Sequence, residues 1–99
     1  MDQKIKKTII DALMKVVDSA PTRNNWFSQQ GVTEDSFNSW MNYVNSVFQI
    51  TSQYLDANLL FAAYNSIQTI TMQTNMDYAS KTNAICQQIL NFARSILNL

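Results

Sequence analysis

Glycine and proline each occur once in this chain of 99 residues, as Gly31 and Pro21. These two residue types interrupt regular structure most strongly, and both lie in the first third of the sequence. Long helices can therefore run through the remaining segments without a break. A chain of 99 residues has room for one hydrophobic core, so we expect a single helical domain over residues 1–99.

Apolar residues recur with the period of an α-helix in four segments of the chain. The predicted helices cover about residues 2–18, 34–54, 57–72 and 74–97. A short extra helix is expected near residues 21–30, because Pro21 can begin a helix and Gly31 can end one. Short connections make successive helices antiparallel neighbours, so the predicted fold is all-α, a compact antiparallel bundle of four main helices.

Three of the predicted helices carry start signals in the sequence. Thr33 can cap the second helix, and the two acidic residues that follow it suit the positive end of a helix dipole. Asp56 can cap the third helix in the same way. Thr74, with Asp77 three residues later, resembles a capping box and predicts the start of the last helix.

The charge balance indicates which partners and compartments to expect. Seven basic and seven acidic side chains cancel, so nucleic acid is an unlikely partner. From Ser36 to Met76 the only charged residue is Asp56, yet frequent amides and hydroxyls rule out membrane spans. The single cysteine, Cys86, has no partner for an intramolecular disulfide, and no signal-peptide pattern opens the sequence. We therefore expect a cytoplasmic protein.

No motif in the sequence requires a particular chemistry. The chain has no histidine, which is the commonest general base and a frequent metal ligand. One glycine cannot make a phosphate-binding loop, and most carboxylates stand where helix caps are expected. Cys86 is interpreted as a small buried hydrophobic residue. The sequence therefore predicts no enzyme activity, no cofactor and no metal.

Apolar side chains on the second predicted helix form two adjoining stripes, which cover about half of its circumference. A helix that packs on one core needs a stripe only a little more than about 100° wide. Either this helix is central and buries both stripes, or part of the second stripe is exposed. We expect the exposed arrangement, as an interface rimmed by neutral amides. The predicted interface residues are Trp40, Tyr43, Val47, Ile50, Tyr54 and Phe61.

The leading functional hypothesis is a non-enzymatic protein that acts by occupying a surface, as a homo-oligomer or on a larger partner protein. An inhibitor of phage or bacterial origin that acts on a defence-type protein is one form of it. The alternative is a protein that binds or sequesters a small, nucleotide-like molecule in a pocket of aromatic and amide side chains. A weak contact with nucleic acid or membrane through Lys4, Lys6, Lys7 and Lys15 is the third hypothesis.

Overall fold

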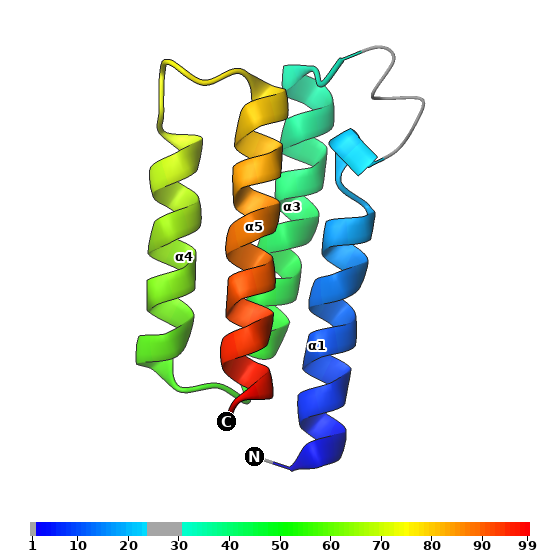
Figure 1. Cartoon of the computed structure of the whole chain (residues 1–99), viewed down its shortest axis with the longest axis vertical. Coiled ribbons are helices and arrows are strands. Elements are labelled where there is room, and N and C mark those ends of the chain that lie inside the picture. The colour runs from blue at the N-terminus through cyan, green and yellow to red at the C-terminus, as the bar shows by residue number, and fades with distance from the viewer. Residues whose placement is uncertain (1, 24–30) are drawn as a thin grey trace.

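Four α-helices account for most of the residues that the computed structural model describes, 2–23 and 31–99. They are α1 (Gln3–Asp18), α3 (Glu34–Thr51), α4 (Ala57–Thr71) and α5 (Tyr78–Leu97). Figure 1 shows the helices side by side, with successive helices running in opposite directions. The prediction of an all-α bundle of four main helices is confirmed. Of the short helix expected near residues 21–30, a 3-10 turn, η1 (Pro21–Arg23), is seen, and residues 24–30 lie outside the described residues.

Side-chain caps fix where all four of these helices begin, and Asp2 caps α1. The hydroxyl of Thr33 accepts a hydrogen bond from the backbone N–H of Ser36 at 3.1 Å, and the Ser36 hydroxyl accepts from the backbone N–H of Thr33. Asp56 caps α4, as its position in the sequence predicts. The prediction that Thr74 opens the last helix is wrong, because α5 is capped by Asp77, whose carboxylate accepts from the backbone N–H of Ser80 at 2.7 Å.

The second helix ends earlier than its apolar pattern predicts. It stops at Thr51, and not near Tyr54, because the backbone switches to a tighter turn. The N–H of Tyr54 donates to the carbonyl of Thr51, three residues back, at 3.0 Å. Such i→i−3 bonds are the usual way in which the last turn of a helix tightens before the chain changes direction. This tight turn leads directly into the cap of α4.

The core lies between α1, α3 and α5. Leu13 of α1, Val44 of α3 and Ile89 of α5 are all fully buried in it. The rings of Phe48 and Phe92 stack across the core with their centroids 5.2 Å apart. Since α5 packs extensively against both α1 and α4, it is the central helix of the bundle.

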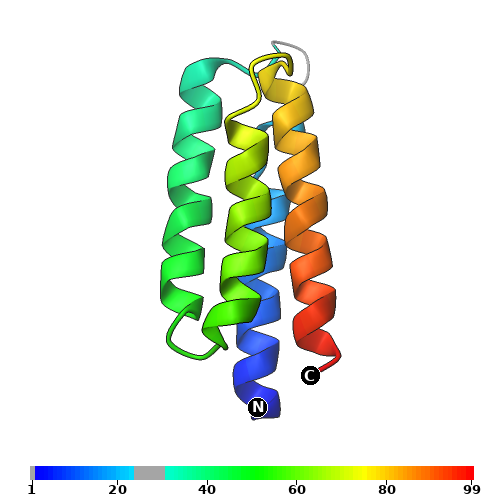
Figure 2. The same ribbon diagram turned by 90° about the vertical axis from the view of Figure 1, so that its left-hand side faces the viewer.

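Helix α4 is the least buried of the four. Ile67 is its only fully buried residue among the described positions, although nine of the fifteen residues of α4 are apolar. Figure 2 shows α4 between α3 and α5, with α1 on the far side. Its backbone packs mainly against α5 and makes few close contacts with α3, the helix that precedes it in the chain. The side of α4 that faces α3 is therefore left partly open.

Two buried lysines satisfy carbonyl groups at the C-terminal ends of helices. The Nζ of Lys6 donates to the carbonyl of Leu97, the last residue of α5, at 3.2 Å. The Nζ of Lys81 donates to the carbonyl of Thr71, the last residue of α4, at 3.0 Å. A cation at a helix C-terminus is favourable because it lies at the negative end of the dipole. The hypothesis of a basic contact surface that includes Lys6 is therefore wrong for that residue, which is only 8% exposed.

Candidate binding face

Two of the six predicted interface residues belong to the intramolecular core. Trp40 is 4% exposed and Val47 is 7% exposed, so the prediction that they lie on an open surface is wrong. The indole N–H of Trp40 donates to the backbone carbonyl of Val16 in α1 at 2.9 Å. The physical reason is that α3 contacts both α1 and α5, so this helix buries a wider arc than packing against a single neighbour would require.

The other four predicted residues are exposed, but they do not form one surface. Tyr43 lines a hollow beside Pro21, at the edge of α3 nearest to α1. Ile50 lies seven residues after Tyr43 and therefore on the same side of α3. Tyr54 is exposed in the turn that follows. Phe61, which is 60% exposed, is on α4 and lines a different pocket.

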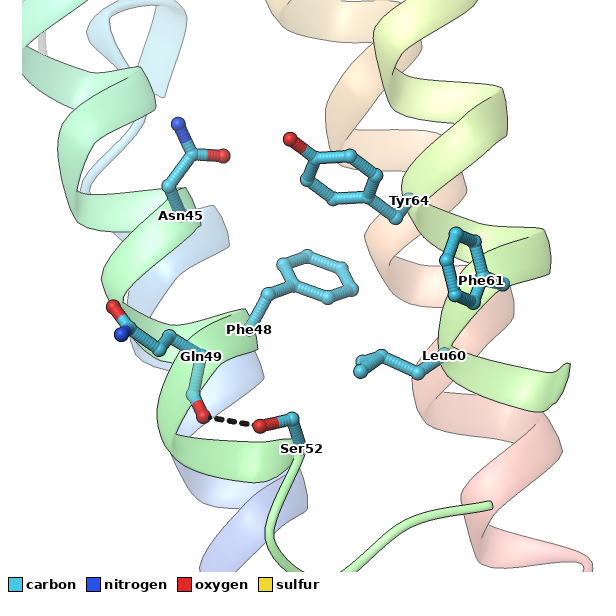
Figure 3. A pocket seen from close by; sticks show the side chains of 7 residues that line it. All are labelled: Asn45, Phe48, Gln49, Ser52, Leu60, Phe61 and Tyr64. Carbon is cyan, nitrogen blue, oxygen red and sulfur yellow. Dashed lines mark hydrogen bonds between the residues drawn. The ribbon is translucent and has the colours of Figure 1, made fainter. Parts of the chain in front are cut away.

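A pocket of about 430 Å³ lies between α3 and α4. Figure 3 shows its two walls, with Phe48 of α3 pointing toward Leu60 of α4, and Tyr64 pointing back toward Asn45. We call it the apolar pocket. Its lining residues are Asn45, Phe48, Gln49, Ser52, Leu60, Phe61 and Tyr64.

The sequence explains why the two helices leave this space open. Asn45, Gln49 and Ser52 follow one another along α3 at spacings of four and three residues, so they form one polar edge. Polar side chains on that edge leave α4 no continuous apolar surface to pack against, whereas α5 offers one. Phe48 is only 4% exposed and forms the floor of the apolar pocket. Phe61 lies on its α4 side and is largely exposed.

None of the seven residues that line the apolar pocket carries a charge. The Ser52 hydroxyl already donates to the backbone carbonyl of Gln49, at 2.6 Å. The pocket therefore offers aromatic and aliphatic surface together with two side-chain amides, which can both donate and accept hydrogen bonds. An ionised ligand would find no opposite charge among these residues.

A second, more polar hollow continues from the apolar pocket along α3. It shares Asn45 with the apolar pocket and is bordered by Asn42, Gln68 and Lys81. The charge of Lys81 is engaged by the carbonyl at the end of α4 and lies 5.5 Å from the centre of the Tyr78 ring. Its ammonium group therefore has a structural role in joining α4 to α5.

Cys86 is the one cysteine of the chain, and the prediction that it is buried is confirmed, with 1% of its surface exposed. Burial raises the pKa of the Cys86 thiol, because desolvation disfavours the thiolate. The charge of Arg23 acts in the opposite direction on the same pKa, and this is the weaker influence. Sequence reasoning missed the proximity of Arg23 to Cys86, because the two residues are far apart in the chain. A thiol with a raised pKa is a poor nucleophile.

Residues 2–23 and 31–99 contain no cluster of three or more carboxylates or cysteines that could hold a metal ion. Within the same ranges, no helix is long and apolar enough to cross a membrane.

Comparisons with protein-family models, with curated proteins and with solved structures found no match. The functional interpretation therefore depends on the geometry and chemistry of the chain itself.

The sequence could have indicated only half of the apolar pocket. The uncharged amides beside Phe48 on α3 are visible as a pattern in the sequence. The opposite wall, made by Leu60, Phe61 and Tyr64, depends on how α4 is oriented in the bundle. Of the predicted interface residues, Phe61 alone lines this pocket.

Proposed function

We propose that this protein acts without catalysis, as a protein-binding module that docks a helix of its partner in the apolar pocket between α3 and α4. The observation that carries this proposal is the open pocket of about 430 Å³ with aromatic walls and no charged lining residue. Recognition of a helix in an apolar groove uses large apolar side chains at intervals of three and four residues. An inhibitor or adaptor that occupies a partner's surface would work in this way.

The lining also defines the chemistry of the partner helix. Leu60 and Phe61 favour an apolar anchor side chain, while Asn45 and Gln49 can bond to amides or hydroxyls beside that anchor. A charge on the docked face of the partner would lose its hydration without gaining an opposite charge. We therefore expect the partner helix to present an uncharged face with a large aliphatic or aromatic residue near its centre.

Two labelled peptides of equal composition test this proposal. One places leucine and phenylalanine on a single helical face among asparagines, and the other has the same residues in scrambled order. Fluorescence anisotropy should show saturable binding of the first peptide only. Gln49→Glu introduces a charge at the wall of the pocket, without changing side-chain size, and should weaken binding by at least about tenfold.

The matched control for this experiment is Gln87→Glu, an identical change on an exposed position of α5 that does not line the apolar pocket. It should leave peptide binding unchanged, and both variants should keep the helical circular dichroism of the parent protein. Equal binding of the two peptides, or equal affinity of the two variants, would contradict the proposed function.

A small-molecule binding role is the second candidate, and the size of the pocket favours it, since ligand pockets measure about 300–1,000 Å³. Because the lining carries no Lys or Arg, a neutral aromatic molecule fits it better than a nucleotide with phosphates. Titration with the neutral fluorophore N-phenyl-1-naphthylamine tests this role, with adenosine monophosphate as the charged comparison. We expect binding of the fluorophore alone, lost in Leu60→Trp, which fills the pocket. Absence of fluorophore binding would remove the second candidate.

A further inference from the structure

Four residues form a stripe along the edge of α4 that borders its open side toward α3, and three of them are exposed while Gln68 is half-buried. We call them the outer stripe: Phe61, Asn65, Gln68 and Met72. Their spacings of four, three and four residues place them on one face of the helix. Met72, the C-cap residue of α4, is 76% exposed, which is the largest exposure among the large apolar residues described. Phe61, at the other end of the outer stripe, is 60% exposed.

The outer stripe is complementary to itself. In an antiparallel pair of identical helices, residue numbers increase along one helix where they decrease along the other. Asn65 lies four residues after Phe61, and Gln68 lies four residues before Met72. If Phe61 packs against Met72 of a second copy, Asn65 therefore faces Gln68 of that copy. The two-fold axis then generates the same contacts again in reverse, as a closed dimer requires.

We infer that the outer stripe of α4 binds the outer stripe of a second copy of this chain in an antiparallel homodimer. The contact between Phe61 and Met72 joins an aromatic ring to a thioether, which is a favourable pair. The contact between Asn65 and Gln68 joins two amides, each of which donates and accepts hydrogen bonds.

The absence of charge on α4 supports a second copy of the chain as the partner that covers the outer stripe. Helix α4 contains no Asp, Glu, Lys or Arg, so a two-fold contact along it brings no like charges together. The whole chain has a formal net charge of zero, so the two copies do not repel each other at long range. A strongly acidic or basic partner would gain nothing from this face.

The area available determines how strong the dimer is. An interface of standard size buries about 800 Å² on each partner, which would be about an eighth of the 6192 Å² that the protein exposes. The outer stripe extends over only about 17 Å of helix, at 1.5 Å per residue. It therefore supports a contact below the standard size, and we expect a dimer that forms reversibly as the protein concentration rises.

This inference goes beyond the proposed function and does not depend on it. The outer stripe shares only Phe61 with the apolar pocket. Asn65 and Met72 do not line that pocket, and Gln49 does not belong to the outer stripe. Asn65 and Met72 can therefore be changed without altering the lining of the apolar pocket, and Gln49 without altering the outer stripe.

Sedimentation equilibrium over a wide range of concentrations is the first test. The mass of the parent protein should rise from 11.3 kDa toward twice that value. Met72→Asp should raise the dissociation constant of the dimer by at least about thirtyfold, because it replaces an apolar contact that occurs twice across the two-fold axis with a desolvated charge. Leu97→Asp is the control. Leu97 is a large apolar residue that is 61% exposed, and it lies at the end of α5.

The second test addresses the antiparallel register. One double variant carries Asn65→Lys and Gln68→Lys, and the other carries Asn65→Glu and Gln68→Glu. Each should be monomeric by itself, because like charges face each other across the two-fold axis. An equimolar mixture should form a heterodimer, because each lysine then faces a glutamate.

A matched pair of changes on α5, Asn83→Lys with Gln87→Lys, should leave the dimer of the parent protein intact, since both residues are exposed and neither belongs to the outer stripe or lines the hollow between α4 and α5. Circular dichroism should show unchanged helix content in every variant. A parent protein that stays monomeric at its highest soluble concentration overturns the inference, and so does a charge-matched mixture that fails to associate. Neither outcome would affect the peptide-binding test of the apolar pocket.

Discussion

Val47→Asp and Ile50→Asp place the same charge three residues apart on α3, in opposite environments. Val47 is 7% exposed, whereas Ile50 is 61% exposed. Replacing Val47 removes about 2 kcal/mol of hydrophobic burial, and leaving an unpaired carboxyl group in the core costs about 1–3 kcal/mol more. The total loss of about 3–5 kcal/mol is a large part of the unfolding free energy of a small domain, which is about 5–15 kcal/mol.

Thermal unfolding followed by circular dichroism measures this difference. Since 1 kcal/mol corresponds to about 4–8 °C for a domain of this size, Val47→Asp should lower the Tm by at least about 12 °C. Ile50→Asp should cost no more than about 1 kcal/mol, mainly from a negative charge near the C-terminus of α3. Equal Tm values for the two variants would refute the assignment of Val47 to the core. Val47 would then have to be assigned to the exposed surface.

Three further predictions concern single contacts. Trp40→Phe removes the indole N–H that donates to Val16 and should reduce the unfolding free energy by at least about 1 kcal/mol in urea titration. Lys81→Met removes the ammonium group from the terminal carbonyl of α4 and should cost about 1 kcal/mol in the same assay. The N–H of Ser80 lowers the pKa of Asp77, so stabilisation by this carboxylate is complete above its unfolded pKa and disappears as pH falls through the lower folded pKa. The Tm difference between the parent and Asp77→Ala should therefore narrow on acidification.

The helices of this protein could be predicted well because their signals are local. Apolar periodicity and the caps Thr33 and Asp56 depend on residues within a few positions of one another. The error at the start of α5 is of the same local kind. Thr74 and Asp77 are both good capping residues, and only the backbone geometry shows that Asp77 holds the N–H of Ser80.

The binding face could not be predicted to the same extent, because it depends on which edges of the helices meet. Trp40 and Tyr43 lie three residues apart and belong to one apolar stripe in the sequence, yet the indole is buried against α1 and Tyr43 is 39% exposed. A helical-wheel projection of the sequence gives the width of the apolar surface on a helix. It does not give the number of neighbouring helices that share this surface.

Helix α4 shows most clearly why the order of helices in the chain does not fix their contacts. The turn between Thr51 and Asp56 is short, and on that ground α3 should be the main neighbour of α4. Instead α4 packs mainly on α5, because α5 offers an apolar surface where α3 presents the amides Asn45 and Gln49. Burial of apolar surface outweighs proximity in the chain, since docking against uncharged amides contributes little hydrophobic free energy. The apolar pocket and the exposed outer stripe both result from this choice of neighbour, and for that reason the two proposed binding surfaces lie on the same helix.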